Sequence, residues 1–395
     1  MPSRRRFLIG TGTAGIATLA GCLGAPEPRY VGESGEEPDT RWWPQPEFDR
    51  IASCYNPRPI GPREAVTERW SLDISLPSSR PVVADGVAFL PTATALRAVD
   101  VKTGEERWRE NGGDEPMWPR RVLWYDGTVY VTQIGEPALI ALDAGTGERE
   151  WTFTPSDSGI RALLLDPEGA DLYAGDGRGT VYALDANTSE LSWQREVFGP
   201  VVAFAQSIPE LLVATEAGEV YGLSPDDGRG YWRQKLPGYI ESLATANGRG
   251  AFVSVFGGPT VELESERAGA VQWRRDTWSS DSFVVAGQTL VAAGHRLAAL
   301  DIRSGGEPQW TGGKTAQCGP AAAGDTIYAA SEDRIAAYDF GGGIGVGPVR
   351  LGAKRWSHPV EGRPEQGLVV ADDAVFVLTE GGEGEASKAY ALETA

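Results

Sequence analysis

The chain has 395 residues, with 36 lysines and arginines against 55 aspartates and glutamates, a formal net charge of −19. This acidic balance argues against nucleic acids or anionic lipid surfaces as partners, because both need a basic footprint on the protein. Only three cysteines and two histidines are present, and they do not cluster with the spacing of a zinc site. A Gly-x-Ser-x-Gly motif is also absent from the sequence, which argues against a hydrolytic triad.

The N-terminus has the features of an export signal. Residues 3–8 read Ser-Arg-Arg-Arg-Phe-Leu, the twin-arginine pattern, with Arg4 and Arg5 as its paired arginines. A mildly apolar run follows and ends in Leu-Ala-Gly-Cys22, which resembles the box in which a lipoprotein cysteine receives its lipid. We therefore predict that residues 1–21 are a signal peptide and that Cys22 is lipidated. The protein would lie on the outer face of the cytoplasmic membrane, held there only by this lipid.

The next segment, residues 22–40, is acidic and rich in proline and glycine, which is typical of a flexible tether. Residues 41–66 are predicted to form a strap that precedes a repeat domain at 67–395. Removal of residues 1–21 takes away three arginines and no acidic residue, so the mature chain would carry a net charge near −22. Together with the export signal, this acidic and lysine-poor composition resembles that of haloarchaeal proteins, whose carboxylates keep them hydrated in high salt.

Most of the chain consists of one recurring segment, which reads strand, Asp turn, glycine corner, then Trp. Its clearest copies are LRAVDVKTGEERW (96–108), LIALDAGTGEREW (139–151) and VYALDANTSELSW (181–193), and weaker copies are VYGLSPDDGRGYW (220–232) and VELESERAGAVQW (261–273). The repeat tryptophans lie 37 to 46 residues apart, close to the roughly 40–45 residues of a four-stranded propeller blade. They are Trp70, Trp108, Trp151, Trp193, Trp232, Trp273, Trp310 and Trp356.

A hairpin with a polar tip lies between successive tryptophans, as in VVADGVAFL (82–90) and LWYDGTVYV (123–131). Asp-Gly tips are typical of tight hairpin turns, whose central residues take positive φ. After Trp356 the chain supplies a hairpin and a short third strand at 388–393, whereas 67–74 reads as an outer strand without a blade. We therefore predict an all-β, eight-bladed propeller of four-stranded antiparallel blades, closed by pairing of the N- and C-terminal strands in one blade.

The repeated residues have structural explanations. A tryptophan at the same place in every repeat is expected to pack between blades and to hydrogen-bond through its indole N–H. The repeated aspartates, such as Asp100 and Asp143, are expected to accept backbone N–H groups in turns. The glycines that follow, such as Gly104 and Gly147, supply a left-handed corner. These positions are therefore predicted to hold the fold, and the sequence indicates neither a catalytic residue nor a metal ligand.

Two cysteines remain after Cys22 is assigned to the lipid. Cys54 lies in the strap, and Cys318 lies at the entry to the first strand of the seventh repeat unit. Outside the cell two such cysteines can form a disulfide, and the ring closure would bring their surroundings together. Two separate buried thiols are an equally good interpretation.

The repeat A-L-D-x-x-T-G-x-x-x-W resembles that of the pyrroloquinoline-quinone (PQQ) type β-propeller family over roughly residues 42–395. The resemblance is clearest in residues 98–108, 141–151 and 183–193. The family includes quinoprotein dehydrogenases and also non-enzymatic lipoprotein propellers that act as protein-binding scaffolds. Quinoprotein dehydrogenases characteristically place two adjacent cysteines against the quinone, whereas this chain has no adjacent pair. The resemblance therefore implies the propeller fold. The departure from the dehydrogenase pattern predicts that the protein binds neither PQQ nor another cofactor and is not an enzyme.

The favoured function is a lipid-anchored, extracytoplasmic scaffold that binds a protein or peptide, because arginine and tryptophan in loops are typical interface anchors. The alternatives are a glycan-binding or glycan-processing propeller, which would need exposed aromatics around two convergent carboxylates, and a PQQ-dependent dehydrogenase. The loops before each inner strand should face the central channel and bind the partner, which the sequence does not identify. Their candidate residues are Arg80, Met117, Trp118, Arg120, Arg121, Arg161, Tyr239, Glu241, Asp281 and Glu365.

Overall fold

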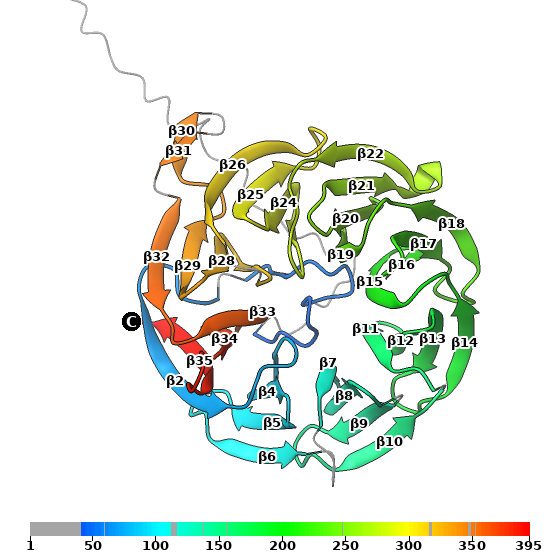
Figure 1. The fold of residues 1–395 in the computed structure, drawn as a ribbon, viewed down its shortest axis with the longest axis horizontal. Helices are drawn as coiled ribbons and strands as arrows, with labels where there is room; N and C mark the ends of the chain where they lie inside the picture. Colours follow the sequence, from blue (N-terminus) through cyan, green and yellow to red (C-terminus); the bar gives the residue numbers. More distant parts are fainter. Residues whose placement is uncertain are drawn as a thin grey trace, which may run out of the picture.

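A computed structural model describes residues 41–395 except 59, 112–116, 137, 156, 247, 316–317, 347–348 and 352. The described chain forms eight four-stranded antiparallel blades arranged in a ring around a central channel (Figure 1). In each blade the first strand lies nearest the channel and the fourth lies at the rim. The predicted export signal, the tether and Cys22 lie outside the described residues.

The first four blades each use four consecutive strands. Blade 1 contains β3 (Val82–Ala84), β4 (Val87–Thr92), β5 (Ala95–Asp100) and β6 (Glu106–Glu110). Blade 2 contains β7 (Pro119–Tyr125), β8 (Thr128–Gln133), β9 (Leu139–Asp143) and β10 (Arg149–Phe153). Blade 3 contains β11 (Ile160–Asp166), β12 (Asp171–Asp176), β13 (Thr180–Asp185) and β14 (Leu191–Glu196). Blade 4 contains β15 (Val201–Ser207), β16 (Glu210–Thr215), β17 (Glu219–Leu223) and β18 (Gly230–Lys235).

The other blades follow the same order with additions. Blade 5 contains β19 (Ile240–Thr245), β20 (Ala251–Val255), β21 (Thr260–Glu264), a 3-10 turn η1 (Ser265–Arg267) and β22 (Ala270–Arg275). Blade 6 contains β23 (Val284–Ala286), β24 (Thr289–Ala293), β25 (Arg296–Asp301) and β26 (Glu307–Lys314). Blade 7 contains β27 (Ala321–Ala323), β28 (Thr326–Ser331), β29 (Arg334–Asp339) and β32 (Lys354–Pro359), with β1 (Tyr55–Asn56) added in parallel to β27. Blade 8 contains β33 (Arg363–Ala371), β34 (Ala374–Glu380), β35 (Ser387–Thr394) and β2 (Val66–Ile74).

Blade 8 confirms the predicted ring closure. The N-terminal strand β2 pairs antiparallel with the C-terminal strand β35, with Thr67 opposite Glu393 and Asp73 opposite Lys388. The fourth strand of this blade is thus the first long strand of the chain. Because the two ends share one sheet, the ring has no open blade edge between its first and last repeat.

The repeat tryptophans pack between blades as predicted, but the predicted hydrogen bond of every indole N–H is wrong for Trp273, whose buried N–H has no partner among the described residues. Trp108, in the fourth strand of blade 1, donates its indole N–H to the carbonyl oxygen of Ala144 in blade 2, at a distance of 2.9 Å. Trp70, Trp193 and Trp310 make the same kind of hydrogen bond to the blade that follows their own. The ring of Trp108 rests on Gly147, where an added Cβ would lie 2.7 Å from two ring atoms. Gly147 has a φ of +75°, so this glycine serves both the left-handed corner and the close approach of the indole.

The repeated aspartates form the predicted turns. Asp143 accepts the backbone N–H groups of Gly145 and Thr146 at 3.1 and 2.7 Å, and Asp100 and Asp185 accept the equivalent pair of N–H groups in their own blades. The glycine-rich segment 341–352 contains a short antiparallel hairpin of β30 (Ile344–Val346) and β31 (Val349–Leu351). The β-branched residues Ile344, Val346 and Val349 favour strands there.

The strap before β2 contacts all eight blades. Along the chain it contacts first the inner part of blade 8 and then blades 1 to 7 in order. In Figure 1 it is the blue trace that runs around the channel. The bonded pairs are Arg41–Asp372, Trp43–Val83, Pro44–Trp124, Gln45–Leu165, Arg50–Gln206, Ile51–Thr245, Ser53–Val285 and Cys54–Ala322. Each blade residue in these pairs lies close to the turn between the first and second strands, apart from Asp372, which is in that turn itself. We call the face that carries these turns the strap face.

The opposite face, which we call the mouth face, carries the loops that enter each first strand and the turns between second and third strands. The core lies within and between the blades and is divided among five buried clusters, the largest of which joins the strap to blades 1, 6, 7 and 8. In the part of the chain that the structure describes, no helix has the length and apolar character needed to cross a bilayer.

Candidate functional site at the mouth of the channel

Arg80, at the entry to blade 1, is buried rather than presented to solvent, with 2% of its surface exposed. Its guanidinium donates to the carbonyl oxygens of Pro46 at 2.8 Å and Gln366 at 3.1 Å, and it forms an ion pair with Asp281. Burial alone would lower the pKa of Arg80, but Asp281 and other nearby negative groups raise it. Arg80 therefore joins the strap to blades 6 and 8 and leaves little of its charge for a partner.

The two cysteines are free thiols, not a disulfide. Both are buried, and the Cys54 sulfur accepts a hydrogen bond from Arg80 at 3.1 Å. Burial raises the pKa of each thiol to about 12, because a thiolate would be poorly solvated there. The alternative of two separate buried thiols therefore describes this structure, and neither sulfur has the low pKa of a reactive cysteine.

Three arginines from blades 2 and 3 form the basic half of the mouth, which we call the arginine cluster: Arg120, Arg121 and Arg161. Arg161 forms an ion pair with Glu216, and Arg121 lies 3.8 Å from Glu47 of the strap. No carboxylate among the described residues forms an ion pair with Arg120. Partial burial and the positive charges of Arg161 and Arg121 lower the pKa of Arg120. A negative group from a partner would relieve this repulsion.

Carboxylates from blades 5, 6 and 8 form the acidic half of the mouth. Burial raises the pKa of Glu241, and the neighbouring charge of Asp281 raises it further. Burial also raises the pKa of Glu365, which forms an ion pair with Arg363. The predicted basic residues Arg120, Arg121 and Arg161 thus come from blades 2 and 3, whereas the predicted acidic residues Glu241, Asp281 and Glu365 come from blades 5, 6 and 8.

A small cavity lies beside the channel. Glu47, Arg121, Glu241 and Asp281 help to line a cavity of about 40 Å³. A water molecule occupies about 30 Å³ of liquid, whereas pockets for small organic ligands have about 300–1,000 Å³. This cavity therefore does not fit a tricyclic quinone or a sugar ring, although three carboxylates line it.

A row of aromatic side chains from blades 5 and 6 lies at the acidic side of the mouth. Tyr239 and Phe256 of blade 5 are 40% and 59% exposed, with ring centroids 6.5 Å apart. The ring centroid of Phe256 lies 5.9 Å from that of Trp278, and the centroid of Trp278 lies 5.3 Å from that of His295. Trp278 and His295 belong to blade 6. We call these four residues the aromatic ladder. Among them the sequence identified only Tyr239, although a large apolar residue before the Gly-Gly-Pro turn at 257–259 was a usable signal.

The other predicted residues of the mouth have different environments. Trp118 is 39% exposed at the entry to blade 2, whereas Met117 beside it is fully buried in the core between blades 1 and 2. Arginine and aromatic side chains are the residues that most often anchor protein interfaces. The mouth face therefore presents both of these residue types, in the aromatic ladder and the arginine cluster. In the described part of the chain, no group of three or more His, Cys, Asp or Glu residues is placed to hold a metal ion.

Solved structures of known proteins share this fold. Quinohemoprotein alcohol dehydrogenase from Comamonas testosteroni superposes with a TM-score of 0.69 at 14% identity, over 91% of this chain and 82% of that one. BamB from Moraxella catarrhalis superposes with a TM-score of 0.62 at 16% identity, over 83% of this chain and 98% of that one. A computationally designed protein, Ika8, gives a TM-score of 0.66 at 15% identity, over 82% and 99% of the two chains. At these identities the likeness shows the fold alone.

Two curated relatives are similar in sequence. The serine/threonine-protein kinase AfsK of Streptomyces griseus is 31% identical over 291 residues, which is 70% of this chain and 30% of the kinase. The outer membrane protein assembly factor BamB of Yersinia pestis is 28% identical over 198 residues, 46% of this chain and 48% of that protein. The chain thus spans less than half the length of either relative. The family described as outer membrane protein assembly factor BamB matches residues 63–205 and 177–383. The chain therefore belongs to this family of PQQ-type β-propellers.

Proposed function

We propose that this protein is a scaffold that binds a partner protein on the mouth face, through the aromatic ladder and the arginine cluster. The observation that carries this proposal is the exposure of Phe256 beside Tyr239 and Trp278 on the mouth face. Exposed aromatics in a row are costly to leave in water, so an apolar partner surface would be favourable. Membership of the BamB family supports a role in protein binding.

We further propose that the scaffold is exported by the twin-arginine route and anchored by a lipid on Cys22. The support is the ordered pair of sequence motifs before the tether. A protein anchored in this way would present its propeller outside the cell, about one tether length from the membrane. Two attached acyl chains would hold it stably, whereas one would be marginal.

The binding surface can be tested by site-specific photo-crosslinking in cells. A photoreactive amino acid in place of Phe256 should yield a discrete adduct, whereas the same group in place of Glu148, an exposed position on the strap face, should not. Arg120→Glu should strongly reduce the adduct, because it puts a negative charge where a negative partner group is expected. Adducts of equal yield at both positions, or none at Phe256, would count against the scaffold function.

The anchor can be tested in the same cells. Cys22→Ser should release the protein into the medium, and Arg4→Lys combined with Arg5→Lys should retain it inside the cell. The measurement is the distribution of the protein among medium, membrane and cytoplasm by immunoblot. Mass spectrometry of the mature chain that shows an unmodified Cys22 would refute the lipid anchor.

A further inference from the structure

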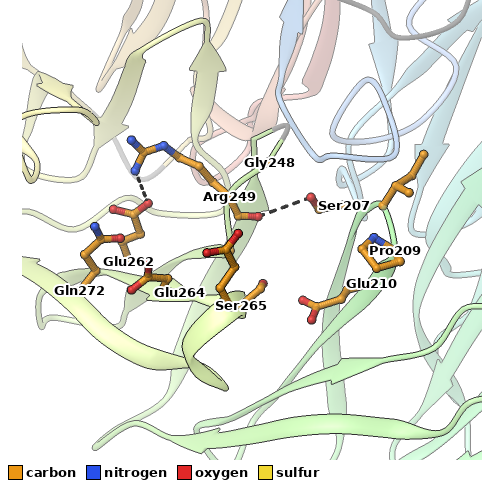
Figure 2. A pocket seen from close by; sticks show the side chains of 12 residues that line it. Ser207, Pro209, Glu210, Gly248, Arg249, Glu262, Glu264, Ser265 and Gln272 are labelled. Carbon is orange, nitrogen blue, oxygen red and sulfur yellow. Dashed lines mark hydrogen bonds and ion pairs between the residues drawn. The ribbon is translucent and has the colours of Figure 1, made fainter.

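A second pocket lies on the strap face, between blades 4 and 5 and away from the mouth. Its volume is about 530 Å³, within the range of pockets for small organic ligands. The turn between β15 and β16 supplies one wall, and the turn between β19 and β20 together with β21 and η1 supplies the other. Figure 2 shows Glu210 on one side and Glu262, Arg249 and Gln272 on the other.

Glu262 interrupts the repeat. In every blade one residue of the third strand lies opposite the repeat tryptophan, and Glu262 has this place opposite Trp273. In the other seven blades it is alanine or glycine, in the pairs Ala98–Trp108, Ala141–Trp151, Ala183–Trp193, Gly222–Trp232, Ala299–Trp310, Ala337–Trp356 and Ala391–Trp70. Glu262 is only 1% exposed. A buried carboxylate where the fold needs only a small side chain is not explained by packing.

The buried oxygens of this pocket are incompletely paired. One oxygen of Glu262 accepts a hydrogen bond from Arg249 at 2.6 Å, and its Oε2 has no partner. Glu210 is 8% exposed; its Oε1 accepts the indole N–H of Trp232 at 3.0 Å, and its Oε2 has no partner. The hydroxyl of Ser265 in η1 is also buried and unpaired. All three residues line the pocket, and buried polar atoms without a partner are unusual in folded proteins.

The hydrogen bond made by the repeat tryptophan of blade 4, Trp232, differs from those in other blades. Trp108 and three of its counterparts donate to a backbone carbonyl of the following blade, whereas Trp232 donates to the side chain of Glu210. The indole thereby fixes one oxygen of Glu210 and leaves the other one free in the pocket. At this position a bond from the tryptophan to a carboxylate replaces the bond to a backbone carbonyl that links other neighbouring blades.

The charge of the pocket specifies the ligand class. Its lining includes four glutamates, Glu210, Glu262, Glu264 and Glu266, and the cation Arg249, while Glu264 also forms an ion pair with Arg267. The acidic groups thus outnumber the two cations. The unpaired oxygens of Glu210 and Glu262 accept hydrogen bonds, and the negative charge of a carboxylate favours a donor that carries positive charge. An alkylammonium group supplies three donors on a compact charge.

We propose that this pocket binds an alkylammonium group, with Glu262 and Glu210 as its carboxylate partners. The site goes beyond the proposed scaffold function and lies on the other face, so either one can fail without the other. The group could belong to a free diamine or to a lysine side chain of a peptide, which present the same chemistry. The described residues offer no cluster of three acidic or imidazole ligands for a metal ion, which favours the organic cation over calcium.

Isothermal titration of the purified protein with 1,5-diaminopentane tests the site, with 1,5-pentanediol as the neutral isostere. In about 1 M KCl, where the Debye length is about 3 Å, nonspecific attraction of cations to this acidic protein is suppressed. We expect one diamine per protein with a Kd of about 1 mM or tighter, and no heat from the diol. A lysine-containing peptide that competes with the diamine assigns the site to side chains, and a peptide that does not compete assigns it to free amines.

Two variants locate the site. Glu262→Ala restores the residue type of the other blades, so it should fold with an unchanged or higher Tm and bind the diamine at least tenfold more weakly. Glu210→Gln keeps the bond from Trp232 and should also weaken binding at least tenfold. Glu190→Ala, an exposed acidic residue of blade 3, is the matched control and should leave Kd unchanged. Equal binding of diamine and diol, unchanged Kd in both pocket variants, or binding of calcium but not of diamine would each overturn the proposal.

Discussion

The contact between each repeat tryptophan and the glycine of the following blade predicts a measurable difference between two glycine variants of blade 2. Gly147→Ala places a methyl group 2.7 Å from the ring of Trp108 at a φ of +75°. Gly127→Ala places one at a φ of +85° with no other atom within 4 Å. Both variants strain the backbone similarly, whereas only the first also drives the indole away from its bond to Ala144.

The magnitude follows from these two contributions. Left-handed backbone costs an alanine about 1–2 kcal/mol, so Gly127→Ala should lower the free energy of unfolding by that amount. An overpacked methyl group adds about 1–3 kcal/mol, so Gly147→Ala should lower the free energy of unfolding by about 2–5 kcal/mol in total. Unfolding in guanidinium chloride, followed by tryptophan fluorescence, measures both values. If the two variants lose the same stability, the indole contact does not hold neighbouring blades together, and our explanation of the repeat is wrong.

Three further predictions concern the ring closure, the strap and the cofactor. Deletion of residues 389–395 removes buried residues of β35, including Leu392, and should cost several kcal/mol and lower the guanidinium midpoint; a truncated chain with the parent's midpoint would argue against closure through blade 8. Burial raises the pKa of Asp49 in the strap from 3.8 to about 6, so the folded state holds this proton more tightly and stability should fall by up to ~3 kcal/mol as the pH rises from about 4 to 6. Asp49→Asn should flatten that part of the curve of stability against pH, and an unchanged slope would assign it to other groups. Titration with PQQ and calcium should give no quinone absorbance on the purified protein and no dye-linked oxidation of alcohols; a stoichiometric complex would reopen the dehydrogenase alternative.

The architecture could be predicted from the sequence because its determinants are repeated. Each copy of the Asp turn, glycine corner and tryptophan independently indicates the same local structure, and the two incomplete units at 67–74 and 388–393 predict their own pairing. The strap had no such redundancy. Seven of its eight bonded pairs with the blades use backbone groups alone, and only the pair with blade 3 uses a side chain, that of Gln45. Its course around the channel therefore could not be read from residues 41–66.

The candidate sites were predicted only in part, for a related reason. The loop residues of the mouth were found by their place in the repeat, but burial depends on neighbours far away in sequence. Arg80 contacts Pro46, Asp281 and Gln366, which no local pattern connects, and it was therefore assigned to binding rather than to structure. Glu262 could have been found, because it is a glutamate in a column of alanines and glycine. The low similarity of segment 261–273 to the other copies was itself the signal.

The course of the strap has a consequence for how the protein reaches its native state. Residues 41–56, which leave the ribosome early, have their hydrogen-bond partners in all eight blades, the last of them at Asp372. Strand β2 likewise pairs with β35, which lies at the other end of the chain and is synthesised last. Neither segment can complete its contacts while the chain is still being made, and contacts between such distant residues slow folding. The blades can form one after another, but the ring and the strap that ties it must assemble together at the end.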